Sequence, residues 1–160
     1  MLRLSISPSW KSAQRLLPHW PRAHVLKCPT DDGSVRRRVG DAAPMLTADD
    51  GVSCLWIRAQ DGHLDVVNAL LEAGGRELAM MTTDNGASCL MISAQIGHLD
   101  VTNALLEAGG RELVMLTTDN GASCLSVARQ ANLGEVCRVL ETACQNAGLS
   151  SHEITILKRG

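Results

Sequence analysis

The sequence contains no phenylalanine and no tyrosine, and it has only three tryptophans among 160 residues. With 45% apolar residues the chain can still build the core of one domain, but aliphatic side chains, methionine and cysteine must fill that core. No apolar run approaches the roughly 18 residues that a membrane-spanning helix requires. The G-x-x-x-x-G-K, G-x-S-x-G and H-E-x-x-H motifs are also missing, so no nucleotide, acyl-transfer or zinc-protease site is indicated.

Charge is divided unevenly along the chain, although the net charge is only -2. Residues 1–46 carry eight Lys and Arg against three Asp, whereas residues 47–160 carry seven Lys and Arg against fourteen Asp and Glu. This change from about +5 to about -7 separates a basic leading segment from an acidic remainder. Binding of nucleic acid requires clustered Lys and Arg, so the acidic part is not expected to bind a phosphate backbone.

An internal repeat dominates the second part of the chain. Residues 60–90 and 95–125 differ at only four positions, and the stretch TTDNGASCL occurs unchanged at 82–90 and 117–125. A fixed period of 35 residues predicts stacked supersecondary units, because no single unit of this size can bury its apolar face alone. We divide the repeat into first, second and third units, at about residues 47–81, 82–116 and 117–145.

Each unit begins with a turn and a first helix. The Asn-Gly pairs at 85–86 and 120–121, with Asp50-Gly51 before them, predict tight turns, because both residues of such a pair can take positive φ. Ser53, Ser88 and Ser123 follow these turns at the positions where a helix N-cap belongs. A short apolar helix is therefore expected after each serine.

A second turn and a second helix complete the unit. Gly62 and Gly97 end the first helix, and Asn132 replaces them in the third unit as the next best residue at positive φ. The second helix is amphipathic and is expected to stop at Gly74 and Gly75. In the first unit its apolar face consists of Val66, Val67, Leu70 and Leu71.

This pattern resembles the ankyrin repeat, in which a glycine turn, TPLH and a pair of alanines precede GHLEVVxLLLEAGA. The second unit matches it at Gly86, residues 88–91, Ala94, residues 97–101 and residues 105–109. The resemblance covers about residues 47–143 and implies an all-α ankyrin-repeat solenoid of stacked helix-turn-helix units with projecting β-hairpin turns. Two departures stand out: SCLW, SCLM and SCLS replace TPLH, and the period exceeds the family's usual spacing by about two residues.

The resemblance also implies a protein-binding module without catalytic residues, cofactor or metal. In this family the partner surface is the concave side, made of hairpin tips and the exposed ends of the first helices. Aspartates recur in this row and favour a basic partner segment, although the same residues are also good turn formers. The residues carried over are Asp49, Asp50, Val52, Gln60, Asp61, Asp84, Asn85, Ala87, Gln95, Ile96, Asp119, Asn120, Ala122 and Gln130.

The chain is expected to comprise a leader at residues 1–39, an ankyrin repeat domain at 40–145 and a C-terminal tail at 146–160. Residues 40–51 have the spacing of a further repeat hairpin. The leader is interpreted as a disordered or loosely packed extension. Two alternatives are an organelle-import peptide, since residues 1–30 are basic and free of acid, and a nuclear signal at residues 36–38.

The cysteines and histidines are interpreted structurally. Cys54, Cys89 and Cys124 lie one period apart, farther than a disulfide can bridge, and are expected to be buried as small apolar side chains. His63 and His98 follow the helix-ending glycines, where the resemblance implies a structural role. Zinc binding by the H-x4-H-x3-C pattern at His19, His24 and Cys28 is the alternative in the leader. Six cysteines favour a reducing, intracellular compartment, with the cytoplasm expected.

Two other classes of function remain open alongside the adaptor. The chain could be a regulatory or truncated piece of a larger multidomain ankyrin protein, including an enzyme whose catalytic domain lies elsewhere. Alternatively, it could be a purely structural duplicated array, because units as similar as the second and third carry little sign of tailoring to one partner. Neither a nucleic acid nor a membrane is expected as a partner.

Overall fold

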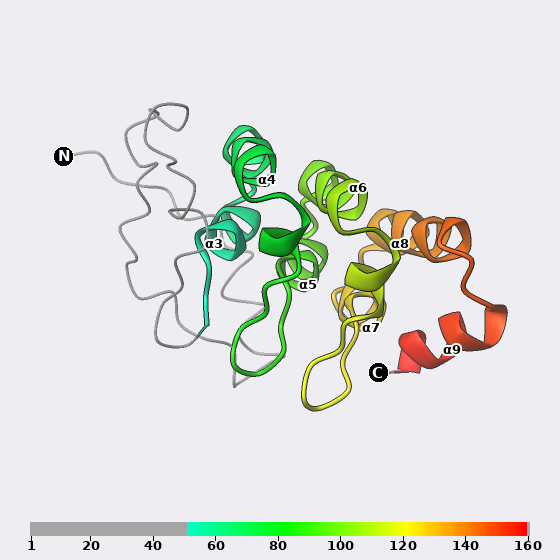
Figure 1. Ribbon diagram of the computed structural model, residues 1–160. Helices are drawn as coiled ribbons and strands as arrows, with labels where there is room; N and C mark the ends of the chain where they lie inside the picture. The colour runs from blue at the N-terminus through cyan, green and yellow to red at the C-terminus, as the bar shows by residue number, and fades with distance from the viewer. Residues whose placement is uncertain (1–50, 160) are drawn as a thin grey trace.

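The computed structural model describes residues 51–159, and the structural statements below concern that part of the chain (Figure 1). Within it every named element is a helix, so the all-α expectation is confirmed. The helices are α3 (Cys54–Asp61), α4 (Leu64–Ala79), α5 (Cys89–Ile96), α6 (Leu99–Met115), α7 (Cys124–Gln130), α8 (Gly134–Asn146) and α9 (Ser151–Arg159).

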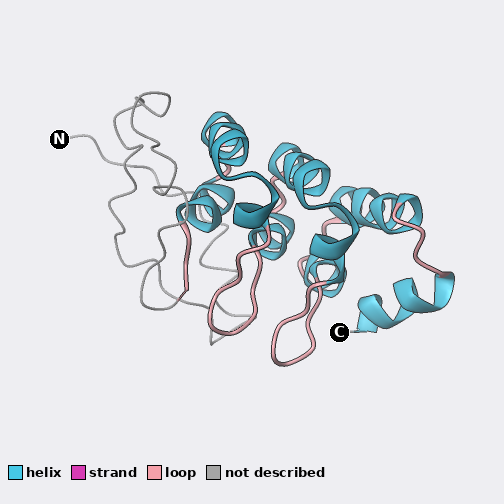
Figure 2. Ribbon diagram, in the orientation of Figure 1, coloured by secondary structure: helices cyan, strands magenta, loops and turns pink. Residues whose placement is uncertain are grey.

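The helices form two rows. The first helices α3, α5 and α7 lie side by side in one row, and the second helices α4, α6 and α8 lie in the other (Figure 1). Long loops leave the second helices of the first and second units and project from the side of the first-helix row (Figure 2). Because each unit contacts the next in both rows, the apolar faces that no unit could bury alone are covered by neighbours.

Each first helix begins at the predicted serine. The side-chain oxygens of Ser53, Ser88 and Ser123 accept hydrogen bonds from the backbone N–H groups three residues later. These contacts satisfy one of the backbone donors that every helix N-terminus leaves without an intrahelical partner. The three N-cap predictions are therefore confirmed.

The ends of the first helices also follow the prediction. Gly62 and Gly97 adopt φ values of 77° and 96°, and Asn132 takes the same left-handed conformation at φ 58°. In the described residues Asn132 is the sole non-glycine with positive φ. Asparagine tolerates this conformation because its short polar side chain can bond locally, so the third unit keeps the turn without glycine.

The second helices continue beyond the predicted stop. Gly75 (φ 57°) and Gly110 (φ 59°) do break α4 and α6, but the chain re-enters a helical turn after each of them. In this extra turn Leu78 and Leu113 are buried, and each packs against the first glycine of the Gly-Gly pair before it. A Cβ at Gly74 would lie 2.7 Å from Cβ of Leu78. The glycine pair therefore serves two purposes, a bend and a close approach.

The core is built from the small side chains that the composition requires. Leu55, Leu90 and Leu125 are fully buried at equivalent positions of the three units, and Trp56 is the single large ring among them. One polar difference between the near-identical units has its partner: Thr102, where the first unit has Val67, donates its hydroxyl hydrogen to the backbone oxygen of His98 at 2.8 Å, and its oxygen lies 3.2 Å from the hydroxyl of Ser93. Ser93 in turn donates to the oxygen of Leu90.

The segment assigned to a C-terminal tail contains helix α9, which packs on α7. Ile154 and Leu157 of α9 are buried, and the hydroxyl of Ser123 donates to the backbone oxygen of Leu157. Lys158 of α9 forms an ion pair of 2.8 Å with Glu141 of α8. Helix α9 therefore lies beside α7 at the end of the first-helix row (Figure 1).

The two hairpin glycines allow a matched test of stacking. A Cβ at Gly86 would lie 3.1 Å from backbone atoms of Thr117 and Thr118, whereas a Cβ at Gly121 would meet nothing within 4 Å. Both residues have similar positive φ. We expect Gly121→Ala to lower the unfolding free energy by about 1–2 kcal/mol through backbone strain alone, and Gly86→Ala to lower it further. Urea denaturation followed by circular dichroism measures both; equal losses would show that the hairpins do not need this close contact.

Candidate functional site

The projecting loops are narrow hairpins held by backbone hydrogen bonds. In the second unit Thr83 N–H donates to Ala87 O at 3.0 Å and Gly86 N–H donates to Thr83 O at 2.8 Å, and Thr82 forms an antiparallel bridge with Ser88. The third unit repeats this arrangement. The tight turns are present at both Asn-Gly pairs, and in each pair only the glycine has positive φ. Asn85 therefore does not adopt the left-handed conformation, and Gly86 forms the bulge of the hairpin.

The hairpin tips are fixed to one another and internally. Asp119 N–H donates to Asn85 O at 3.1 Å, which joins the tips of the second and third units. Within each tip a threonine hydroxyl, Thr83 or Thr118, donates to the side-chain oxygen of the asparagine two residues later. The sequence interpretation missed these threonines, although a threonine two residues before asparagine in both copies of TTDNG is the signal that could have identified them.

The predicted partner residues divide by exposure. Asp49 and Asp50 lie outside the described residues. Asp84 and Asp119 are exposed at equivalent positions of the two joined tips. The other exposed residues are Asp61, Asn120 and Gln130, and the half-buried ones are Gln60, Asn85 and Ile96.

Four of the predicted residues are buried and offer a partner little or no side-chain surface: Val52, Ala87, Gln95 and Ala122. Val52, Ala87 and Ala122 occupy one equivalent position, the residue after the hairpin glycine. In the second and third units the hairpin turns this side chain inward, and both the N–H and the oxygen of Ala87 bond to Thr83. Gln95 is only 6% exposed because the last turn of α5 lies between its neighbours. Ala87 and Ala122 therefore support the tips of the second and third units, and all four residues are buried in the stack.

His98 links two units. Its Nε2 lies 3.0 Å from the backbone oxygen of Gln60, and a Cβ added at Gly62 would lie 2.6 Å from the imidazole ring. The ring therefore closes the end of α3 from the neighbouring unit, which confirms a structural role for this histidine. In the third unit Leu133 takes the equivalent place, and its side chain packs over Gly97. His63 is exposed.

The repeated cysteines are buried, as predicted. The thiol of Cys89 donates to Ala79 O at 3.2 Å and that of Cys124 to Val114 O at 3.6 Å, so each anchors the extra helical turn of the preceding unit. Burial raises the pKa of Cys89 to about 12, and burial followed by the nearby Cys144 raises the pKa of Cys124 to about 12. Such thiols stay protonated and unreactive near neutral pH.

The thiols, histidines and carboxylates of the described residues form neither a disulfide nor a metal-binding cluster. The five cysteines of residues 51–159 are free, and this part contains no group of three or more His, Cys, Asp and Glu placed to hold a metal ion. His19, His24 and Cys28 lie outside it. One hollow of about 770 Å³ lies between α6 and α8 and another of about 440 Å³ at the end of the stack, and neither is lined by a predicted partner residue.

Comparison with known families agrees with the stacked geometry. A family model described as ankyrin repeats (3 copies) matches residues 32–115 and again residues 55–148. The chain belongs to the ankyrin repeat family. Ankyrin repeats are generally protein-protein interaction modules and are typically non-catalytic. A comparison with curated proteins found no match. No ankyrin helix within residues 51–159 is long and apolar enough to cross a membrane.

The equivalent histidines provide a test of the link between units. We expect His98→Ala to lower the unfolding free energy by about 1–3 kcal/mol, because it removes the contact with Gly62 and leaves Gln60 O without this donor. His63→Ala, an exposed control at the equivalent position, should change it by less than about 0.5 kcal/mol. Thermal or urea unfolding compares the two variants; similar losses would remove the special role of His98.

The thiols provide a test that depends on pH. Cys137 is partly exposed, whereas Cys89 and Cys124 are buried with pKa values of about 12, so iodoacetamide should label Cys137 before Cys89 and Cys124, and this buried pair only on unfolding. Because folding raises these two pKa values, the protonated thiols contribute fully to stability below about pH 9, and that contribution falls as pH rises above it. Peptide-level mass spectrometry follows the labelling; rapid modification of Cys89 in the folded chain would contradict this burial.

Proposed function

We propose that this chain is a non-catalytic adaptor that binds a partner protein through the concave side of its ankyrin stack. The binding surface, which we call the tip surface, is defined by its exposed and half-buried residues: Gln60, Asp61, Asp84, Asn85, Ile96, Asp119, Asn120 and Gln130. The supporting observation is the hydrogen bond from Asp119 N–H to Asn85 O, which joins two polar tips into one continuous surface.

Preorganisation is the physical reason that such a surface suits binding. The Thr83 and Thr118 hydroxyls hold the two asparagine side chains, and the buried Ala87 and Ala122 anchor the hairpins from below. A loop that is already ordered loses less conformational entropy when a partner binds. The tips can therefore contribute hydrogen bonds without first being fixed in place.

Charge suggests the kind of partner. Asp84 and Asp119 are exposed at equivalent positions, whereas Asp61 is engaged by Arg58 at 3.5 Å. The two aspartates present the same negative group from neighbouring units, which favours a segment with spaced Lys or Arg side chains. Exposed ion pairs contribute little to affinity, so these charges are expected to act mainly on association rate and orientation.

The first experiment is capture of a partner by the full chain, with charge-matched variants. Asp84→Asn with Asp119→Asn should reduce capture, slow association by a few-fold at low salt and flatten its salt dependence, because the steering charge is lost. The control is Glu72→Gln with Glu107→Gln, which removes two exposed carboxylates, also one unit apart, from the second helices. Surface plasmon resonance with the captured protein measures the association rates.

A captured protein that binds all three chains at equal rates would contradict the tip surface as its docking site. Loss of binding in the Glu72 and Glu107 control alone would move the site to the second-helix row. The substitutions themselves should leave the fold intact, since each is isosteric and lies on an exposed side chain.

A further inference from the structure

The end of the stack differs from the interior at equivalent positions. Ala59 and Ala94 are fully buried between stacked helices, but the third unit has Arg129 in that place. Leucines that pack against the core in the first two units are also replaced in the third: Leu64 and Leu99 by Gly134, and Leu71 and Leu106 by Glu141. In the third unit two charged side chains and a glycine therefore replace apolar residues that make contacts in the other units.

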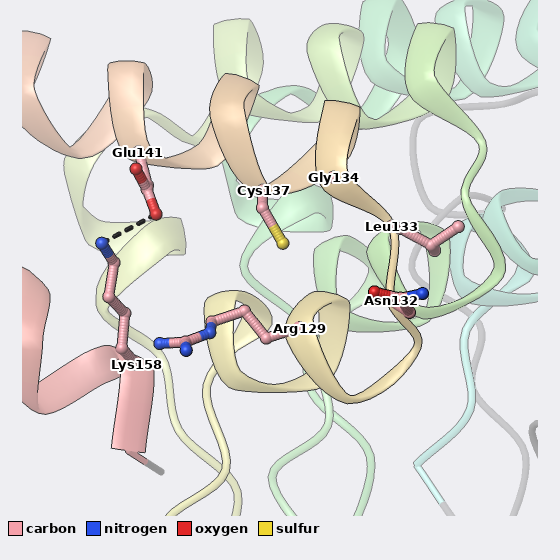
Figure 3. Close-up of a pocket in the computed structure, with 7 residues that line it drawn as sticks. All are labelled: Arg129, Asn132, Leu133, Gly134, Cys137, Glu141 and Lys158. Atoms are coloured by element: carbon pink, nitrogen blue, oxygen red, sulfur yellow. Dashed lines mark ion pairs between the residues drawn. The ribbon is translucent and has the colours of Figure 1, made fainter.

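These exchanges leave a hollow of about 440 Å³, which we call the end socket. Figure 3 shows it between α7, α8 and α9, with Arg129 and Lys158 on one side and Glu141 and Cys137 above. Asn132 and Gly134 line its other edge. Helix α9 packs on α7, and its Lys158 reaches Glu141 of α8 across the socket.

The socket has an excess of positive charge. Lys158 neutralises Glu141 at 2.8 Å, whereas Arg129 forms no ion pair with any of residues 51–159. Burial and then Glu141 raise the pKa of the Cys137 thiol, so that group stays neutral near pH 7 and does not oppose an anion. Two cations and one carboxylate leave a net charge of +1 around the hollow.

We propose that the end socket binds a carboxylate from an acidic segment of a partner protein, at a site separate from the tip surface. The guanidinium of Arg129 presents a planar fork of donors that matches a carboxylate, and the ion pair of Lys158 with Glu141 leaves that fork as the net positive group of the socket. The net charge of +1 balances one carboxylate, whereas a phosphate group with close to two negative charges would exceed it.

A further ankyrin unit does not fit this place. The next unit would bury the residue that stands at Arg129, and a charged side chain that is buried without a partner costs several kcal/mol. In the interior the same position carries alanine, which is 0% exposed in both units. Arginine in place of alanine therefore disfavours the stacking of a further unit, and it gives the socket a cation that can bind a polar group.

The test uses the full chain, labelled with nitrogen-15, and a blocked Ala-Glu-Ala peptide as the probe. Addition of the peptide should shift the amide signals of Asn132 and Gly134 with a dissociation constant in about the millimolar range. Arg129→Ala restores the residue that the other units carry, so the fold is retained, and it should weaken binding by about tenfold. Arg138→Ala, which removes an exposed arginine of α8 outside the socket, should leave binding unchanged.

Three results would overturn the proposal: no shifts at the socket amides, equal binding by the Arg129→Ala chain, or tighter binding of the same peptide with phosphoserine in place of glutamate. Arg129→Gln serves as a second variant with an uncharged side chain of similar reach, and it too should lose binding. Since the tip surface is not altered in these variants, a failure here leaves the proposed function to its own test.

Discussion

Burial of each unit's apolar face against the next unit is the constraint on which the rest of this structure depends. Short helices such as α5 and α7 are marginal alone, and an aliphatic core without phenylalanine or tyrosine gains its stability from area shared between neighbours. Close approach makes this possible. Gly62 leaves room for a histidine ring of the adjacent unit, Gly86 for its backbone and Gly97 for a leucine side chain. The hairpin tips repeat with the same spacing as the helices.

Most of the fold could be predicted because its determinants are local and recur. The serine caps, the left-handed Asn132 and the buried cysteines follow from residue chemistry at fixed positions, and the structure places them as expected. The helical turn after Gly75 could not be predicted, since it depends on Leu78 folding back over Gly74. Helix α9 lies outside the repeat period, and its formation depends on the surface of α7 that it covers.

The candidate site was less accessible from sequence for a related reason. Position in a repeat identifies a loop, but it does not say which side chains the loop turns inward; Ala87 and Ala122 lie in the right hairpins and are buried. The exposed aspartates could be inferred because turn chemistry and solvent exposure agree at the tip. The end socket required the three units to be compared in space, where Arg129 stands at the position of two buried alanines.

The hydrogen bond between Asp119 and Asn85 affects the local opening of the hairpins. Because it joins the tips of two units, local opening of one hairpin must break a contact with its neighbour, so fluctuations of the second and third units are coupled along the edge as well as through the helices. The outer edge of the third hairpin meets no further hairpin at Gly121. Of these two hairpins, the one at Gly86 should therefore retain its amide protons longer than the one at Gly121.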